Sequence, residues 1–399
     1  EKSEHDSALA SVWRLYADES KYDEGIAALE EFKTSMAARP NLHELLGDAY
    51  RKTDNVEKSD AAYSEWLRLR QKEIAGTQRP WEYVNLAQRL LDKDILPEKA
   101  LELAERGSQI GGNWYHASTV ARAYVANGRY EEALEQFKLS MNNATRPGTN
   151  VAQAAQWMWR HVAQAGKNAN DEGRFLEIVE NLKNAGSNSL INQLHADLAL
   201  AQYYREHDKP DKVSVYMNRT GFIAESRWSV IGPFDNKSGI GYYVAHIPEN
   251  AAQFDTGTQF PGVGGQVGWE KRDDGSFDGY VNFNKIFKGN SARATAYAWT
   301  SVASPDERGV HLRFGSDDQA KVWLNGEEIF TQANIDTDLH SEPQGIDRHI
   351  VPFTLKAGEN SILVKVCNET SSWGFHLRIT GTDGKVLPDL ELAKDSTGK

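Results

Sequence analysis

The spacing of the apolar residues changes near residue 226, and no other feature of this 399-residue chain constrains its fold as strongly. Residues 1–225 are rich in Ala, Leu, Glu, Gln and Arg, and their apolar side chains recur at the 3.6-residue period of a helix. Residues 226–399 are rich in Gly, Asp, Val, Thr and Trp, and their apolar side chains alternate as in strands. The sequence therefore predicts a multi-domain α + β chain, with a helical domain over 1–225 and an antiparallel β-sandwich over 226–399.

A repeated frame runs through the helical half. Its clearest copy, near residues 114–147, places small residues at two predicted helix crossings, Ala121 and Ala133. Between them lies the turn glycine Gly128, and Phe137 follows as a side chain large enough to fill the groove between helices. This pattern predicts a helical hairpin.

Corresponding anchor positions recur six times in the helical half. They are Trp13, Gly47, Ala87, Ala121, Ala163 and Ala201, spaced 34, 40, 34, 42 and 38 residues apart. The frame resembles the tetratricopeptide (TPR) repeat, whose period is about 34 residues. The resemblance implies an α-solenoid of five or six hairpins with a concave groove that binds peptides or protein partners, and it brings no enzyme activity.

The residue after each anchor is expected to face this groove. These residues are Arg14, Asp48, Gln88, Arg122, Gln164 and Gln202. They are polar but mixed in sign, so the groove is not expected to select acidic C-termini. The alternative is a solvated polar face with no dedicated ligand.

The second half predicts many short strands separated by turns, as in a sandwich or jelly roll. The expected strands are 228–231, 279–287, 294–302, 310–314, 320–324, 328–330, 348–355, 361–367 and 373–379. Asn325-Gly326 is a strong hairpin signal. The glycine-rich segment 262–268 is expected to be a mobile loop, because no helix pattern follows it.

Two segments of the second half resemble PA14-like and galactose-binding-like sandwiches. Residues 314–326 read Phe-Gly-Ser-Asp-Asp-Gln-Ala-Lys-Val-Trp-Leu-Asn-Gly, and residues 355–366 read Leu-Lys-Ala-Gly-Glu-Asn-Ser-Ile-Leu-Val-Lys-Val. The module over roughly 226–390 is similar to one that follows TPR repeats in bacterial secreted proteins. The resemblance implies a jelly roll, a glycan or a neighbouring chain as ligand, and a periplasmic or cell-surface location.

In lectin-type members of that group an Asp-Asp pair holds a calcium ion that binds sugar hydroxyls. The resemblance makes Asp317 and Asp318 candidate calcium and ligand-binding residues, although Gln319 replaces the usual Gly. Calcium needs six to eight oxygen ligands, so the alternative is that the pair only caps a turn. Trp269, in the glycine-rich segment, is the candidate exposed ring for sugar stacking, whereas Trp299 and Trp323 are expected in the core.

Several function classes are disfavoured by the sequence. The net charge of −12 and the lack of a basic tract argue against nucleic acid as a partner. No apolar run approaches 18 residues, so no transmembrane helix is expected. The single cysteine, Cys367, excludes disulfides within the chain and is expected to be a small buried side chain. No nucleophile elbow, zinc-protease motif or phosphate-binding loop is present, so we expect no enzyme activity.

Three hypotheses remain at this point. The first is a non-catalytic extracytoplasmic scaffold that binds a protein partner through the repeats and a glycan or neighbouring chain through the sandwich. The second is a structural subunit that self-associates into a filament or surface layer through open repeat ends and edge strands. The third, implied by the resemblance, is the non-catalytic front of a larger transglutaminase-like enzyme.

Overall fold

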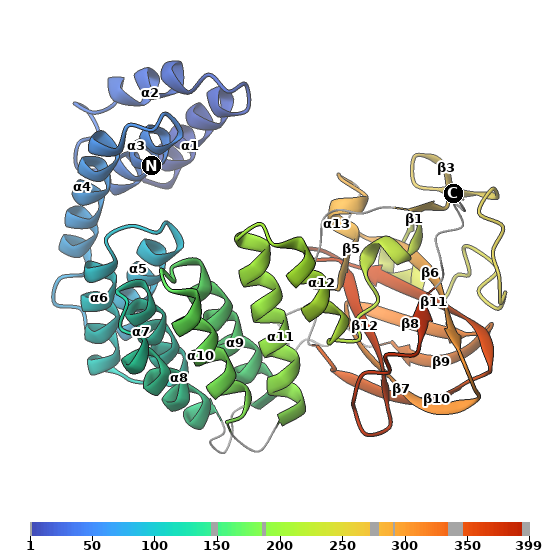
Figure 1. Cartoon of the computed structure of the whole chain (residues 1–399). Coiled ribbons are helices and arrows are strands. Elements are labelled where there is room, and N and C mark those ends of the chain that lie inside the picture. The colour runs from blue at the N-terminus through green and yellow to red at the C-terminus, as the bar shows by residue number, and fades with distance from the viewer. Residues whose placement is uncertain are drawn as a thin grey trace. The chain divides into compact units, whose positions relative to one another are not determined.

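The computed structural model describes residues 2–144, 151–185, 189–271, 279–289, 292–333 and 346–392 (Figure 1). In this part of the chain, twelve α-helices precede the first strand, and antiparallel sheets follow. The predicted fold class is therefore confirmed.

The twelve helices form six consecutive pairs in chain order. They are α1 (Lys2–Ala17), α2 (Tyr22–Glu31), α3 (Pro40–Lys52), α4 (Val56–Ile74), α5 (Pro80–Asp92), α6 (Pro97–Ile110), α7 (Trp114–Ala126), α8 (Tyr130–Ala144), α9 (Val151–Lys167), α10 (Glu172–Lys183), α11 (Ser189–Glu206) and α12 (Pro210–Asn218). Four of them begin with proline, which has no N–H to leave unbonded in the first turn. Gly128 has φ of +70° in the turn between α7 and α8, as its place in the repeat predicts.

The chain divides into two compact units, Glu1–Ala123 and Tyr124–Lys399. The helices α8 to α12 therefore belong to the same compact unit as the sheets. The change from helix to strand falls between Asn218, where α12 ends, and Ser229, where the first strand begins. The division of the chain into domains at residue 226 stays a prediction.

Hairpin α3–α4 in the first unit shows why its anchor is small. A Cβ atom on Gly47 would lie only 2.6 Å from the ring of Tyr63 on the facing helix. Ser59 Oγ also donates a hydrogen bond to the Gly47 carbonyl at 3.0 Å. The two helices therefore cross at a distance that leaves no room for a side chain. The anchors Ala87 and Ala121 are likewise fully buried.

The strands of the second unit form three antiparallel sheets. They are β1 (Ser229–Asp235), β2 (Gln259–Gly262), β3 (Gly265–Gly268), β4 (Glu270–Lys271), β5 (Tyr280–Asn282), β6 (Ala294–Ser304), β7 (Arg308–Asp317), β8 (Gln319–Leu324), β9 (Glu327–Gln332), β10 (His349–Leu355), β11 (Gly358–Asn368), β12 (Gly374–Gly381) and β13 (Glu391–Leu392). The seven-stranded sheet runs β4-β1-β6-β11-β8-β9, with β13 also paired to β6. The four-stranded sheet runs β10-β7-β12-β5, and β2 pairs with β3.

The two larger sheets enclose a common apolar core, which makes this region a sandwich. Val364 of β11 contributes from the seven-stranded sheet, and Phe314 of β7 and Phe375 of β12 contribute from the four-stranded sheet. The outer face of the seven-stranded sheet is also covered, because Tyr297 and Leu363 belong to a second buried cluster. The central strands β6 and β11 are therefore buried on both faces, rather than on alternate residues only.

The structure agrees with one expected strand feature and differs from two. The Asn325-Gly326 hairpin is confirmed, because Leu324 pairs with Glu327 across it and both turn residues have positive φ. The strand expected over 279–287 is wrong beyond Asn282, whose side chain accepts the Lys285 N–H at 3.1 Å and starts the short helix α13 (Phe283–Ile286). The loop expected over 262–268 is also wrong, because the antiparallel strands β2 and β3 form a hairpin there.

Candidate functional site

Two predicted groove residues of the first unit, Asp48 and Gln88, are tied into bonds between neighbouring hairpins. Lys93 Nζ lies 2.6 Å from Asp48 Oδ1, joining α5 to α3. Gln88 Nε2 donates to Thr119 Oγ1 at 2.9 Å, and Tyr115 donates to Gln88 Oε1 at 3.0 Å. These side chains hold one repeat to the next.

Arg14 and Arg122 have contrasting environments in the first unit. Arg14 is exposed on α1, whereas the side chain of Arg122 is only 1% exposed and its guanidinium bonds to Asp92 Oδ1 at 2.7 Å. The expectation that Arg122 presents its charge to an open groove is therefore wrong. A guanidinium can be buried at this position because the carboxylate of Asp92 neutralises it.

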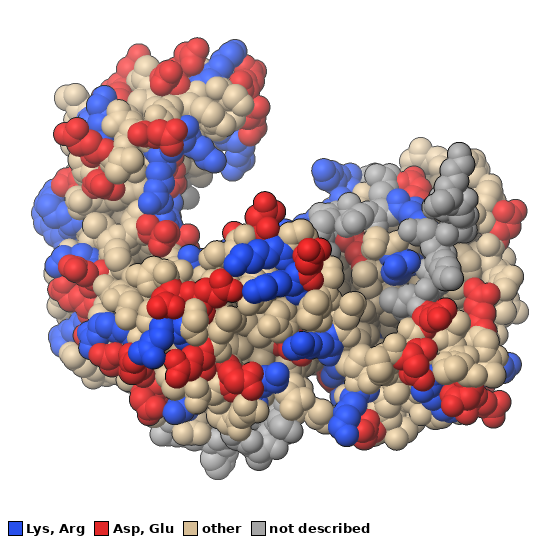
Figure 2. Space-filling view, in the orientation of Figure 1, with Lys and Arg blue, Asp and Glu red and all other residues tan. Residues whose placement is uncertain are grey.

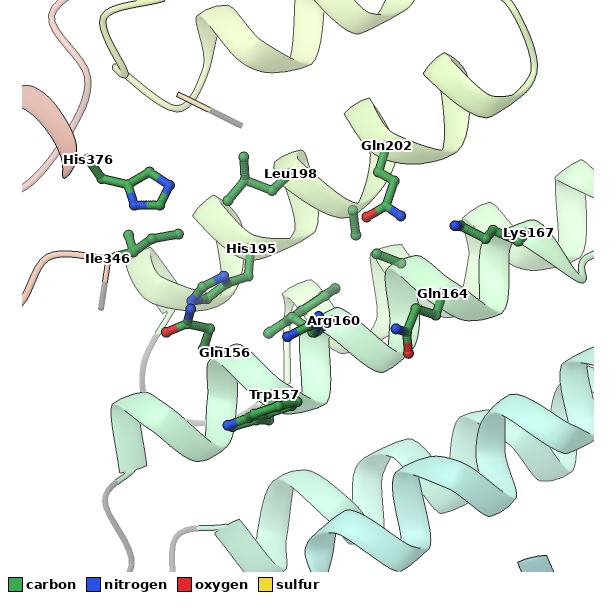
Figure 3. Close-up of a pocket in the computed structure, with 13 residues that line it drawn as sticks. Gln156, Trp157, Arg160, Gln164, Lys167, His195, Leu198, Gln202, Ile346 and His376 are labelled. Atoms are coloured by element: carbon green, nitrogen blue, oxygen red, sulfur yellow. The ribbon is translucent and has the colours of Figure 1, made fainter. Parts of the chain in front are cut away.

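The last two predicted groove residues, Gln164 and Gln202, line the same cavity in the second unit. This cavity has a volume of about 490 Å³ and lies between α9 and α11 (Figure 3). The helix α9 supplies Trp157 and Arg160 to the wall of the cavity, and α11 supplies Leu198. The structure thus brings together residues that are 38 positions apart in the sequence, as the repeat frame predicts.

Cationic and amide groups gather at one end of this cavity, which we call the α9–α11 cavity. Figure 3 shows Gln164, Lys167 and Gln202 together there. Glu206, behind them, accepts from Gln202 Nε2 at 3.0 Å and pairs with Lys167 Nζ at 3.2 Å. Arg160 lies with its guanidinium carbon 5.1 Å from the centre of the Trp157 ring, a cation–π arrangement.

The charged side chains that line the α9–α11 cavity are cations. Among the described residues that line it, Arg160 and Lys167 are cationic and none is Asp or Glu. The whole chain carries −12, and on the face shown in Figure 2 acidic and basic side chains are mixed over the helices. A positive cavity is therefore a local feature and not a reflection of composition.

Two histidines close the other end of the cavity. His195 comes from α11 and His376 from β12, and both are 7% exposed. Burial lowers the pKa of His195 to about 4, because an imidazolium would be desolvated there. At neutral pH His195 is therefore uncharged and can act as both a hydrogen-bond donor and an acceptor.

An ion cluster beneath this end connects the sandwich to the helices. Asp347 accepts from Arg378 Nε at 2.6 Å and from Arg313 NH1 at 2.9 Å. Arg378 NH1 also donates to the Thr220 carbonyl at 3.1 Å, just after α12. The side chains of all three charged residues are at most 13% exposed. The cluster therefore fixes the wall of the cavity that the sandwich supplies.

The candidate calcium ligands lie at the end of β7, where Asp318 bonds within the protein. Asp318 Oδ2 accepts the Glu369 N–H at 2.9 Å, and its carbonyl accepts from Ser316 Oγ at 3.1 Å. In the described ranges, no group of three or more His, Cys, Asp or Glu side chains is arranged to hold a metal ion. Calcium binding by Asp317 and Asp318 stays a prediction.

Trp269 does not provide the exposed ring that was expected of it. Its side chain is 9% exposed and packs against Phe254 and Trp299, with ring centres 5.1 and 6.3 Å away. The glycine-rich segment pairs as β2 and β3, and this region covers the outer face of the seven-stranded sheet. The ring is thus part of that second core. Trp323, expected in the core, is indeed buried.

Sequence reasoning missed the histidines and the ion cluster. Asp347 lies just before β10, in a stretch without apolar periodicity, and Arg378 alternates with apolar residues on β12 as an outward-facing residue would. Only the docking of this sheet against α11 and α12 buries them. A clue was available in Leu194-His195-Ala196, where a histidine interrupts an apolar run of a helix.

Comparisons with known proteins give only distant similarities. No protein-family model matches the chain, and no curated protein matches its sequence. A kinesin light chain protein of Podosopora anserina with nearly identical TPR-like repeats is 18% identical, over 44% of this chain and 93% of that one, with a TM-score of 0.29. PilF of Pseudomonas aeruginosa is 13% identical, over 54% of this chain and 90% of its own, with a TM-score of 0.26.

A third similar structure is PilW, a type IV pilus biogenesis factor. It is 10% identical, over 53% of this chain and 90% of its own, with a TM-score of 0.29. With TM-scores below 0.3, these likenesses are too weak to support a functional assignment. Separately, no helix within the described part of the chain is both long and apolar enough to cross a membrane.

Proposed function

We propose that this chain is a non-catalytic scaffold that binds an extended segment of a protein partner in the α9–α11 cavity. The observation that carries the proposal is the convergence of Gln164 and Gln202 with two cations and a tryptophan in one cavity. In the first unit, Asp48, Gln88 and Arg122 hold hairpins together instead.

The amides of the cavity suit the backbone of an extended peptide. A glutamine side chain offers both a donor and an acceptor, as a main-chain peptide group does. Gln156, Gln164 and Gln202 place three such amides along the cavity, and the bond from Gln202 Nε2 to Glu206 orients the last of them. An extended segment needs partners for the N–H and C=O groups that it would otherwise bond to water.

The other lining groups indicate which side chains the segment carries. Arg160 and Lys167 favour an acidic side chain, because bringing a carboxylate into a positive cavity is electrostatically favourable. Trp157 and Leu198 favour an apolar residue next to it. The proposed ligand is therefore an extended segment with one acidic and one apolar residue. A periplasmic or cell-surface location is part of the same proposal and rests on the resemblance of the second half alone.

The test begins with a random peptide library displayed on phage and selected against the full chain. We expect a consensus with an acidic residue beside an apolar one. Isothermal titration calorimetry of the consensus peptide should then show an affinity loss of about tenfold or more in Gln164→Ala/Gln202→Ala, because each lost hydrogen bond is worth about 1 kcal/mol.

The matched control is Gln136→Ala, a half-buried glutamine on α8 outside the cavity. It should leave the affinity unchanged. Equal affinity of the wild type and the double variant would show that the peptide binds elsewhere, and a library that yields no consensus would reject the cavity as a peptide site.

A further inference from the structure

A second cavity lies on the opposite side of α11, in the same compact unit. Its volume is about 480 Å³, and the helices α10, α11 and α12 form its wall together with the turn that follows β12. Asp197 lines this cavity and His195 lines the first one. His195 and Asp197 are two positions apart, and such residues are separated by about 200° around a helix axis. The helix α11 therefore presents one face to each cavity. The second cavity is therefore distinct from the proposed peptide site.

Asp197 is a buried carboxylate with an unbonded oxygen in this cavity. The residue is 6% exposed, and its Oδ1 atom has no hydrogen-bond partner among the described residues. Among the described residues, the cation that pairs with it, Arg219 NH1, lies 4.0 Å away, beyond hydrogen-bonding distance. A buried carboxylate oxygen without a donor is costly, and burial accordingly raises the pKa of Asp197. The cavity thus presents an acceptor for which the described part of the chain supplies no donor.

Three cations line the same cavity as this acceptor. Lys183, Arg219 and Lys385 line the cavity and have only loose or surface pairings, at 3.9 Å to Glu180 for Lys183 and 3.2 Å to Asp383 for Lys385. Arg378 lines it as well, but its guanidinium is already bonded to Asp347 and Thr220.

This distribution of charge selects between kinds of ligand. A simple amine would satisfy Asp197 but would offer no partner to Arg219 and Lys183, the cations that act on Asp197. A simple anion would be attracted to the cations but would leave Asp197 Oδ1 unbonded beside another negative charge. A molecule with an ammonium and a carboxylate close together satisfies both sets of groups.

The remaining wall of the cavity is apolar. Leu190 and Leu194 of α11 face Val386 and Pro388 of the turn after β12. Leu190 is 39% exposed, a large fraction for a leucine, so apolar surface is left for a ligand to cover.

We infer that this second cavity is a binding site for a free apolar α-amino acid, with its ammonium on Asp197, its carboxylate at Arg219 and Lys183, and its side chain against Leu190 and Val386. Nothing in the peptide-binding proposal requires such a site. The ligand lies between the helices and the sandwich, in contact with elements of both.

Calorimetric titration of the full chain with leucine, isoamylamine and isocaproate tests the inference. These probes share one side chain, and the last two lack the carboxylate and the ammonium respectively. We expect leucine to bind and each truncated probe to bind at least about tenfold more weakly. Asp197→Asn should reduce leucine affinity by a similar factor, and Arg219→Gln, a change at an exposed side chain, tests the carboxylate arm if the first variant does not fold.

Gln164→Ala/Gln202→Ala is the control, because it alters the other cavity and should leave leucine binding unchanged. Failure of that variant to bind peptide would not affect the amino-acid site, so the two proposals fail independently. The inference is overturned if none of the apolar amino acids binds. It is also overturned if isocaproate binds as well as leucine, which would indicate an anion site only. The third such result is that Asp197→Asn and Arg219→Gln both bind leucine like the wild type.

Discussion

The substitution Asp347→Asn tests whether one carboxylate neutralises two buried guanidiniums at the junction of helices and sandwich. Arg378 is 5% exposed and Arg313 13%, and both donate to Asp347. Removing one partner of a buried ion pair leaves an uncompensated charge and costs about 3–5 kcal/mol. Because Asp347 serves two guanidiniums, we expect the loss in the free energy of unfolding to lie within that range or above it.

Hydrogen exchange of β12 peptides in increasing urea is the suitable assay, because it reports on the second compact unit separately from α1 to α6. Asp383→Asn is the matched control. Its carboxylate pairs with Lys385 at 3.2 Å on the surface, and we expect no measurable change. A loss below about 1 kcal/mol for Asp347→Asn would refute the reasoning, since that is the value of an exposed pair. The double variant Asp347→Asn/Arg378→Met should show a coupling energy of about 1–3 kcal/mol between the two sites.

Three further predictions follow from single residues. Gly47→Ala should lower the free energy of unfolding by about 1–3 kcal/mol, because the new Cβ overlaps the Tyr63 ring. Gly309 has open space around it, so Gly309→Ala should not lower the free energy of unfolding, and thermal unfolding compares the two variants. Cys367 is 1% exposed and burial raises its pKa to about 11, so the thiol should react with Ellman's reagent only in denaturant, and rapid reaction of the native protein would contradict its burial. His195 has its pKa lowered to about 4 from the ordinary 6.5, so the unfolded state binds a proton that the native state does not. The free energy of unfolding should therefore fall by about 3 kcal/mol as the pH drops from about 6.5 to about 4. Urea titrations of His195→Gln should lack this part of the decline, and identical pH profiles for the variant and the wild type would disprove the role of His195.

The helical half was predictable because its structure depends on local spacing. Small anchors such as Gly47 and Ala121 recur where two helices cross, and this requirement is visible in any single repeat. The strands β6 to β12 could also be located from alternation and turn signals, such as Asn325-Gly326. Their order could not, because β11 lies between β6 and β8 through pairing over long sequence separations.

The sites were less predictable, because burial and charge pairing depend on tertiary packing. The repeat frame singled out Gln164 and Gln202, which line the cavity, but gave the same weight to Gln88, which joins two hairpins through Thr119 and Tyr115. Trp269 was misjudged because it directly follows a glycine-rich segment, while the cluster that buries it comes from segments distant in sequence. Both cavities depend on α11, whose two faces carry no distinguishing motif.

The central claim is that the α9–α11 cavity receives a segment of a protein partner, and the most direct measurement is binding of the selected consensus peptide to a variant altered only there. We predict that Gln164→Ala/Gln202→Ala loses about tenfold or more in affinity while Gln136→Ala binds like the wild type. We also predict that replacing the acidic residue of the peptide by its amide weakens binding to the wild type. Undiminished affinity in the double variant, together with indifference to the acidic residue, would contradict the account.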